Sequence, residues 1–176
     1  ANENKENLIN SIKSITYKKR NILSELAEII GFDFQNYIKK HKVYMDLEDL
    51  NRAKNEGFGI AAHSWDHPYF YELSLEQQLT NAQKSIDFIK ENNFLDECFA
   101  FPFTDLDVKN VFFNGIFDKN KNLEYTFGIS GVKLDSFERN LHRIPMETNF
   151  SAKEEIDFES NYFQLKKLFN KNIVKR

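Results

Sequence analysis

Two histidines separated by three residues are the first groups in this sequence that could do chemistry. His63 and His67 lie in the segment GFGIAAHSWDHPYF, and Pro68 disfavours a helical conformation at His67. A strand that ends near His63 and continues into a tight turn would let both imidazoles reach one cation. Two imidazoles suit zinc or a neighbouring divalent metal, although a catalytic zinc usually takes three protein ligands and keeps a position for water. The pair predicts part of a metal site; the alternative is two ordinary surface or capping histidines.

Three aspartates near this segment could assist a metal or act as bases. Asp105 and Asp107 follow a predicted strand, so they would lie on the same rim as the histidines and could supply a third ligand or a base. The alternative is that they cap the next helix, which is the commoner role of an aspartate in such a place. Asp66, between the histidines, could hydrogen-bond a ligand imidazole or face the solvent.

Aromatic residues crowd the same segment. Trp65, Tyr69, Phe70 and Tyr71 place several rings beside the histidines, and such rings either stack on sugar rings or pack into a core. The whole chain contains 18 phenylalanines, and for most of them packing is the expected role.

The elements that would position these residues alternate between strand and helix. Apolar runs predict strands at 58–64, 97–103, 123–131 and 141–147. Amphipathic segments predict helices at 46–56, 74–91, 105–118 and from 151 to about 168. Strands that alternate with helices indicate a parallel sheet and the α/β class.

The first 42 residues are polar and helical in pattern, and they differ from the rest of the chain. Their apolar stripe stops at Gly31, a plausible helix end, and Asp33 can cap a second short helix. We therefore predict a helical N-terminal segment at 1–42 and an α/β part at 43–176. The length of 176 residues fits one domain overall, either complete or a fragment of a longer protein.

Composition argues against a nucleic-acid partner, an internal disulfide and a membrane-spanning segment. The formal net charge is -3 and the 24 Lys and Arg are scattered, so nucleic acid is not an expected partner. Cys98 is the single cysteine, so no internal disulfide is expected. No apolar run approaches the roughly 18 residues of a membrane span, and the N-terminus lacks the features of a signal peptide. A cytoplasmic or a cell-envelope location fits these features, and the oligomeric state is left open.

The histidine segment resembles a motif of a known family. GFGIAAHSWDHP, followed by a leucine-rich capped helix, is similar to the second motif of the polysaccharide deacetylases, also called the NodB-homology or carbohydrate esterase family four. That motif is a His, a Ser or Thr, two variable residues and a His, after a glycine-containing strand. The resemblance implies that His63 and His67 bind the metal and that Ser64 steadies the loop.

Two further segments carry the resemblance, which covers about residues 43 to 150. FAFPFTD resembles the aromatic-Pro-aromatic turn that walls the family's substrate groove, which implies a groove lined by Phe101, Pro102 and Phe103, with Trp65 beside them. LHRIPME resembles the closing strand of some bacterial members. The implied fold is an incomplete or distorted (β/α) barrel of the polysaccharide deacetylase type.

The chain also departs from the family pattern. Members begin with a strand that ends in two aspartates, a metal ligand and the general base, and no such strand precedes His63. Either that strand lies upstream or this copy is inactive. Ala100 stands where the family has an arginine that orients the base. His142 is the candidate general acid and Asp105 a candidate base within this chain; the alternative for His142 is an exposed histidine on a strand.

The resemblance implies a metal-dependent hydrolase that removes acetyl groups from a carbohydrate, acting on a C–N bond that is not a peptide bond. The cofactor would be a divalent metal, with zinc the first candidate, and the partner an acetylated carbohydrate. The leading alternative is a non-catalytic carbohydrate-binding or interaction domain on the same scaffold. An unrelated α/β protein with an accidental histidine pair is the third reading.

Overall fold

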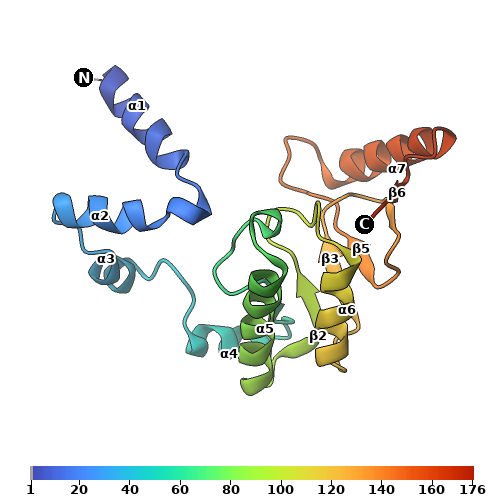
Figure 1. Cartoon of the computed structure of the whole chain (residues 1–176), viewed down its shortest axis with the longest axis horizontal. Coiled ribbons are helices and arrows are strands. Elements are labelled where there is room, and N and C mark those ends of the chain that lie inside the picture. The colour runs from blue at the N-terminus through green and yellow to red at the C-terminus, as the bar shows by residue number, and fades with distance from the viewer. Residues whose placement is uncertain (1) are drawn as a thin grey trace. The chain divides into compact units, whose positions relative to one another are not determined.

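A computed structural model describes residues 2–176. The chain divides between Glu56 and Gly57 into two compact units, which are described separately (Figure 1). The division predicted after residue 42 stays a prediction from composition. No helix in the described part of the chain has the length and apolar character that crossing a membrane requires.

The first unit is helical, as predicted for its first 42 residues. It contains α1 (Asn2–Lys13), η1 (Tyr17–Lys19), α2 (Asn21–Ile29), α3 (Phe34–His41) and α4 (Leu47–Asn55). Among residues 5–56, whose side chains are described, only Ala27 is buried. Little apolar surface is therefore removed from water within this unit.

Local capping explains where these helices begin and end. The Asp33 side chain accepts a hydrogen bond from the Asn36 amide and starts α3, as predicted. Asp46 and Asp49 form a capping box that starts α4. Gly31 follows α2 with φ +65°, a conformation that glycine adopts without steric cost.

The second unit is an α/β layer structure, which confirms the predicted fold class. Four parallel strands, in the order β1-β2-β3-β5, form its sheet: β1 (Ala61–Ala62), β2 (Leu95–Ala100), β3 (Tyr125–Gly128) and β5 (Asn140–His142). Between β1 and β2 the chain forms η2 (Phe70–Glu72) and α5 (Leu75–Glu91), and between β2 and β3 it forms α6 (Asn110–Lys119). Such an open parallel sheet is compatible with an incomplete barrel.

A smaller sheet and a long helix complete this unit. They are β4 (Leu134–Asp135), α7 (Ala152–Leu168) and β6 (Ile173–Val174), and β4 pairs with β6 in parallel. The predicted capping boxes at Ser74 and Ser151 are both present and start α5 and α7. Figure 1 shows α5 and α6 beside each other against β2.

Phenylalanine rings fill the core between the sheet and its helices. Phe101 is fully buried, and its ring centroid lies 5.1 Å from that of Phe99 and 5.2 Å from that of Phe70. Phe112 and Phe113, on α6, lie 5.6 and 5.8 Å from the same ring. Packing is therefore the role of these five rings, as the composition indicated.

Two predicted boundaries are displaced. The helix expected at 105–118 begins at Asn110, because residues 104–109 form a loop in which the Leu106 amide donates to Thr104 Oγ1 and Asp107 has φ 61°. Its N-cap is Lys109, without a side-chain cap, so the capping role weighed for Asp105 and Asp107 is wrong. The strand expected at 141–147 is the three-residue β5.

Candidate metal-binding site

The histidine pair lies at the carboxyl edge of the sheet. β1 ends at Ala62, so His63 is the first residue past the strand, at the edge where parallel α/β sheets build their sites. The chain then turns sharply, since Ser64 and His67 both have positive φ, 70° and 56°. This turn brings His67 back towards His63, as the sequence predicted.

The two rings face each other at a distance that suits one shared cation. His63 Nε2 and His67 Nε2 are 3.2 Å apart. Two nitrogens that each lie at the usual zinc–nitrogen distance in a tetrahedral site are about 3.3 Å apart. The donor set and its spacing therefore fit two of the ligands of a divalent metal.

A hydrogen bond orients the His63 ring so that its Nε2 atom is free to bind a metal. His63 Nδ1 lies 2.8 Å from the carbonyl oxygen of Ala100, so Nδ1 carries the proton and Nε2 keeps its lone pair. Desolvation of the ring lowers the pKa of His63, and the charge of Arg143 lowers that pKa further, whereas the Ala100 carbonyl opposes the shift. His63 is thus held in the neutral form that a metal requires.

The turn between the histidines is tied to itself and to α5. The His67 amide donates to Ser64 Oγ at 3.1 Å, the contact expected of a residue that steadies the loop. Asn81 on α5 accepts from the Trp65 amide at 2.9 Å and donates to the Asp66 carboxylate. Nothing in the sequence singled out Asn81, because its role depends on the packing of α5 against this turn.

A row of partly exposed aromatic rings continues from the histidine pair. The Phe103 ring lies 4.5 Å from the His67 ring and stacks on Tyr69 at 4.2 Å, and Tyr69 lies 5.2 Å from Tyr71. Trp65 and Phe103 are 55% and 46% exposed. These faces are accessible to a ligand that approaches the histidines.

Two residues of the expected groove lie elsewhere. Phe101 belongs to the phenylalanine core and Pro102 is buried as well, so neither side chain is open to a ligand. The Phe101 ring packs against Phe112 and Phe113 of α6, which removes it from the surface. Only Phe103 of the aromatic-Pro-aromatic turn is exposed.

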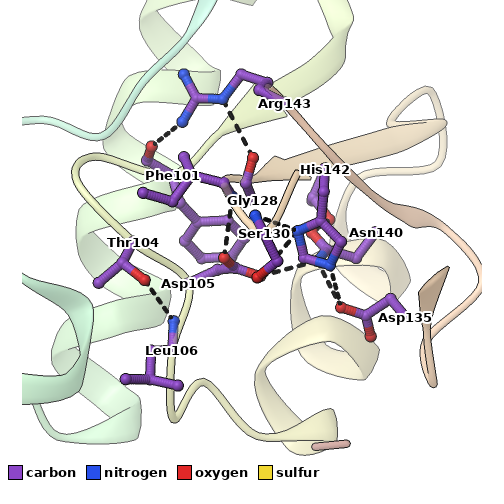
Figure 2. A network of polar contacts seen from close by, with 12 residues as sticks. Phe101, Thr104, Asp105, Leu106, Gly128, Ser130, Asp135, Asn140, His142 and Arg143 are labelled. Atoms are coloured by element: carbon purple, nitrogen blue, oxygen red, sulfur yellow. Dashed lines mark hydrogen bonds and ion pairs between the residues drawn. The ribbon is translucent and has the colours of Figure 1, made fainter. Parts of the chain in front are cut away.

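His142 is placed in a buried polar network (Figure 2). Its side chain is 1% exposed, so the exposed-strand reading is wrong. Nδ1 accepts from the Ser130 amide at 3.2 Å, and Nε2 therefore carries the proton towards Asp135, 3.0 Å away. Both ring nitrogens are engaged inside the protein, and neither is offered to a ligand at the surface.

Asp105 belongs to the same network and is equally engaged. Its carboxylate, 2% exposed, accepts from the Ile129 amide at 3.2 Å and from Asn140 at 3.0 Å, and it forms an ion pair with Arg176. Burial alone would raise the pKa of Asp105, but the hydrogen bond and charge of Arg176 outweigh burial and lower it. A carboxylate held in this way is a poor proton acceptor.

One group of three ligand-type side chains occurs among the described residues, and it already holds a cation. Asp105, Asp135 and His142 place one ligand atom each within 4.8 Å of one another. The Arg176 guanidinium, 1% exposed, contacts both carboxylates and neutralises them, and the pKa of Asp135 is lowered although burial opposes this. Because a buried arginine already neutralises the two carboxylates, a metal ion does not fit this group in the present arrangement.

Comparison with known protein families finds a similarity over part of the chain. The sequence model of the polysaccharide deacetylase family matches residues 27–110. This segment includes both histidines of the turn and the aromatic-Pro-aromatic turn. No curated protein and no solved structure matches the chain.

The matched segment and the fold agree, since the family is a β/α barrel and this sheet is parallel with intervening helices. The match supports a hydrolase function of the deacetylase type. Residues 27–110, slightly less than half of the chain, are thus similar to the polysaccharide deacetylase family.

Proposed function

We propose that this chain forms part of a metal-dependent deacetylase that hydrolyses acetyl groups on a carbohydrate, with His63 and His67 as metal ligands. The observation that carries the proposal is the 3.2 Å separation of the two Nε2 atoms, with His63 Nδ1 bonded to the Ala100 carbonyl. A hydrogen bond from the Nε2–H of a neutral His67 to His63 Nε2 would give the same contact without a metal, and a bound metal would have to displace that proton.

Different residues at this site would bind the metal, bind the sugar and hold the turn in place. A divalent metal on His63 and His67 would supply a Lewis acid that polarises the acetyl carbonyl and activates water. The stacked rings of Phe103 and Tyr69 would hold a sugar ring beside the metal, since aromatic faces suit the apolar faces of sugars. Asn81 would keep the turn, and therefore the second imidazole, in place.

A second function is favoured by one specific observation. Among residues 5–176, whose side chains are described, no third His, Cys, Asp or Glu completes a three-ligand group with the two histidines. A carbohydrate-binding domain that kept the aromatic row without hydrolysis would need no third ligand. Both functions would use the same surface of histidines and aromatic rings, but only the deacetylase would hydrolyse the bound carbohydrate.

Acetate release separates these functions. The purified chain is incubated with N-acetylated and O-acetylated oligosaccharides, with and without added zinc, and the released acetate is measured. The proposal predicts zinc-dependent release that is lost in the His63→Ala, His67→Ala variant and kept in His41→Ala, a histidine of the first unit. Oligosaccharide binding without acetate release would instead support the binding domain.

A further inference from the structure

Arg143 is a partly buried cation at the same edge of the sheet as the histidines. It directly follows β5, and its Nη2 donates to the Phe101 carbonyl at 2.7 Å while Nε donates to the Gly128 carbonyl at 3.3 Å. Figure 2 shows both bonds from the one guanidinium. Two fixed carbonyls, at the ends of β2 and β3, therefore set the orientation of this group.

The guanidinium has no carboxylate partner within the described chain. None of the ion pairs found among residues 5–176, whose side chains are described, includes Arg143, and Asp105 acts on it only through its charge at longer range. Arg143 is half-buried, and this burial lowers its pKa. A guanidinium has five N–H donors, and the two carbonyls use only part of them.

Arg143 and His63 flank the end of one strand. His63 bonds the carbonyl of Ala100 and Arg143 bonds the carbonyl of Phe101, the next residue. Successive carbonyls of an extended chain point to opposite sides, so the imidazole lies on the β1 side and the guanidinium on the β3 side. The charge of Arg143 acts on His63, so the two groups lie near each other at this edge of the sheet.

We propose that Arg143 binds a small free carboxylate, such as acetate, at the edge of the sheet beside the histidine pair. This inference deepens the proposed function, whose product is acetate. The planar guanidinium offers its unused donors as a fork, the geometry that carboxylates bind with two parallel hydrogen bonds. The histidine pair would then bind the metal, and Arg143 the carboxylate formed next to it.

Acetate titration of the metal-free protein tests this inference. The side-chain Nε–H signals of the arginines are followed by NMR in the presence of a chelator while sodium acetate is added. Arg139 is the internal reference, because it is also held by two carbonyls, of Glu124 and Leu123, and lies over the Phe117 ring. We expect the Arg143 signal to shift and saturate with acetate, while the Arg139 signal does not.

Matched variants and ligands decide the outcome. Arg143→Gln should weaken acetate binding by about 10- to 100-fold, as expected for a lost charge-assisted hydrogen bond, and Arg139→Gln should leave it unchanged. Arg143→Lys keeps the charge without the fork and should bind at intermediate strength. Acetamide has the same shape without the charge and should not produce the shift.

The inference is overturned if acetate leaves the Arg143 signal unmoved, or if acetamide or chloride moves it equally. If Arg143→Gln does not fold, the wild-type titration and Arg143→Lys still decide between these results. Because the chelator removes metal, a failure of zinc binding would contradict the proposed function and leave this test intact. Conversely, zinc binding with no acetate effect would contradict the role of Arg143 alone.

Discussion

At the residue scale the account depends on how the two imidazoles are held. A strand end fixes His63, a turn with two positive φ angles returns His67, and Asn81 ties that turn to α5 through Trp65 and Asp66. Ligands that are held before the metal arrives lose less freedom on binding, so the supporting groups contribute to affinity.

Asn81→Ala should weaken zinc binding without removing a ligand. Loss of a group that orients a metal ligand typically costs about 10- to 100-fold in affinity. The measurement is a competition titration with a zinc-binding dye. Lys84→Ala, an exposed residue on the same helix, is the control and should bind like the wild type. Equal affinities for both variants would show that the turn keeps its form without Asn81.

The sequence predicted the residues of this turn and missed those that hold it. His63, His67 and Ser64 form a short local motif, so their proximity follows from a few residues of chain. Asn81 and Arg143 reach the site from α5 and from the end of β5, and only the folded sheet brings these segments together. No local pattern of residue types marks such contacts in advance.

At the element scale the buried ion pair joins the last strand to the sheet. Arg176 follows β6 and contacts Asp105, after β2, and Asp135, in β4. The same carboxylates accept from Asn140, and Asp135 also accepts the proton of His142. One arginine thus neutralises two carboxylates from separate segments.

Arg176→Gln should strongly destabilise the second unit. Removing one partner from a buried ion pair leaves an uncompensated charge and typically costs about 3–5 kcal/mol. Urea unfolding followed by circular dichroism measures this loss. Arg52→Gln, which removes an exposed ion pair with Asp49, is the control and should unfold like the wild type. A variant at Arg176 as stable as that control would contradict the role of this network.

The same network fixes the direction of the pH dependence. The pKa values of Asp105 and Asp135 are lowered in the folded chain, so the unfolded chain binds more protons at acid pH. Their contribution to the free energy of unfolding is present above about pH 4 and is lost as the pH falls towards their folded pKa values. The destabilisation by Arg176→Gln should therefore be largest near pH 7 and shrink as the pH falls towards 2, because the arginine stabilises only the ionised carboxylates; urea unfolding in about one-unit pH steps measures this.

Gly128 is where β3 passes closest to this network. A Cβ at Gly128 would lie 2.3 Å from the Asp105 carboxylate, which is held by its partners and cannot move away freely. Gly128→Ala should therefore lower the melting temperature, by an amount that corresponds to about 1–3 kcal/mol. Gly59→Ala meets only a Leu95 side-chain carbon at 3.5 Å, an ordinary contact, and should not. Equal melting temperatures would mean that the network shifts without cost.

At the scale of the whole molecule the two units differ in how much they bury. The second unit contains the phenylalanine core, whereas only Ala27 is buried among residues 5–56 of the first unit. Hydrogen exchange should therefore be fast in α2 and α3 and slow in β2, α5 and α6, since protection follows buried contacts. Mass spectrometry of exchanged peptides measures this contrast. Equal protection in both units would contradict the burial seen here.

The class of fold followed from sequence periodicity, and its details did not. Alternating apolar runs and capped helices predicted a parallel sheet, and the capping boxes at Ser74 and Ser151 gave the starts of α5 and α7. The start of α6 was predicted five residues early, because Asp105 joins a buried network instead of capping the helix. His142 and Asp135 come together only when β4 and β5 are placed, which no local pattern specifies.

Zinc binding by the intact chain tests the central claim most directly. Isothermal titration with zinc is compared for the wild type, the His63→Ala, His67→Ala variant and the His41→Ala control. We predict one bound zinc in the wild type and the control, and at least about tenfold weaker binding in the double variant, because both ligands are lost. Equal affinity and stoichiometry in all three proteins would show that the zinc lies elsewhere and would contradict the account.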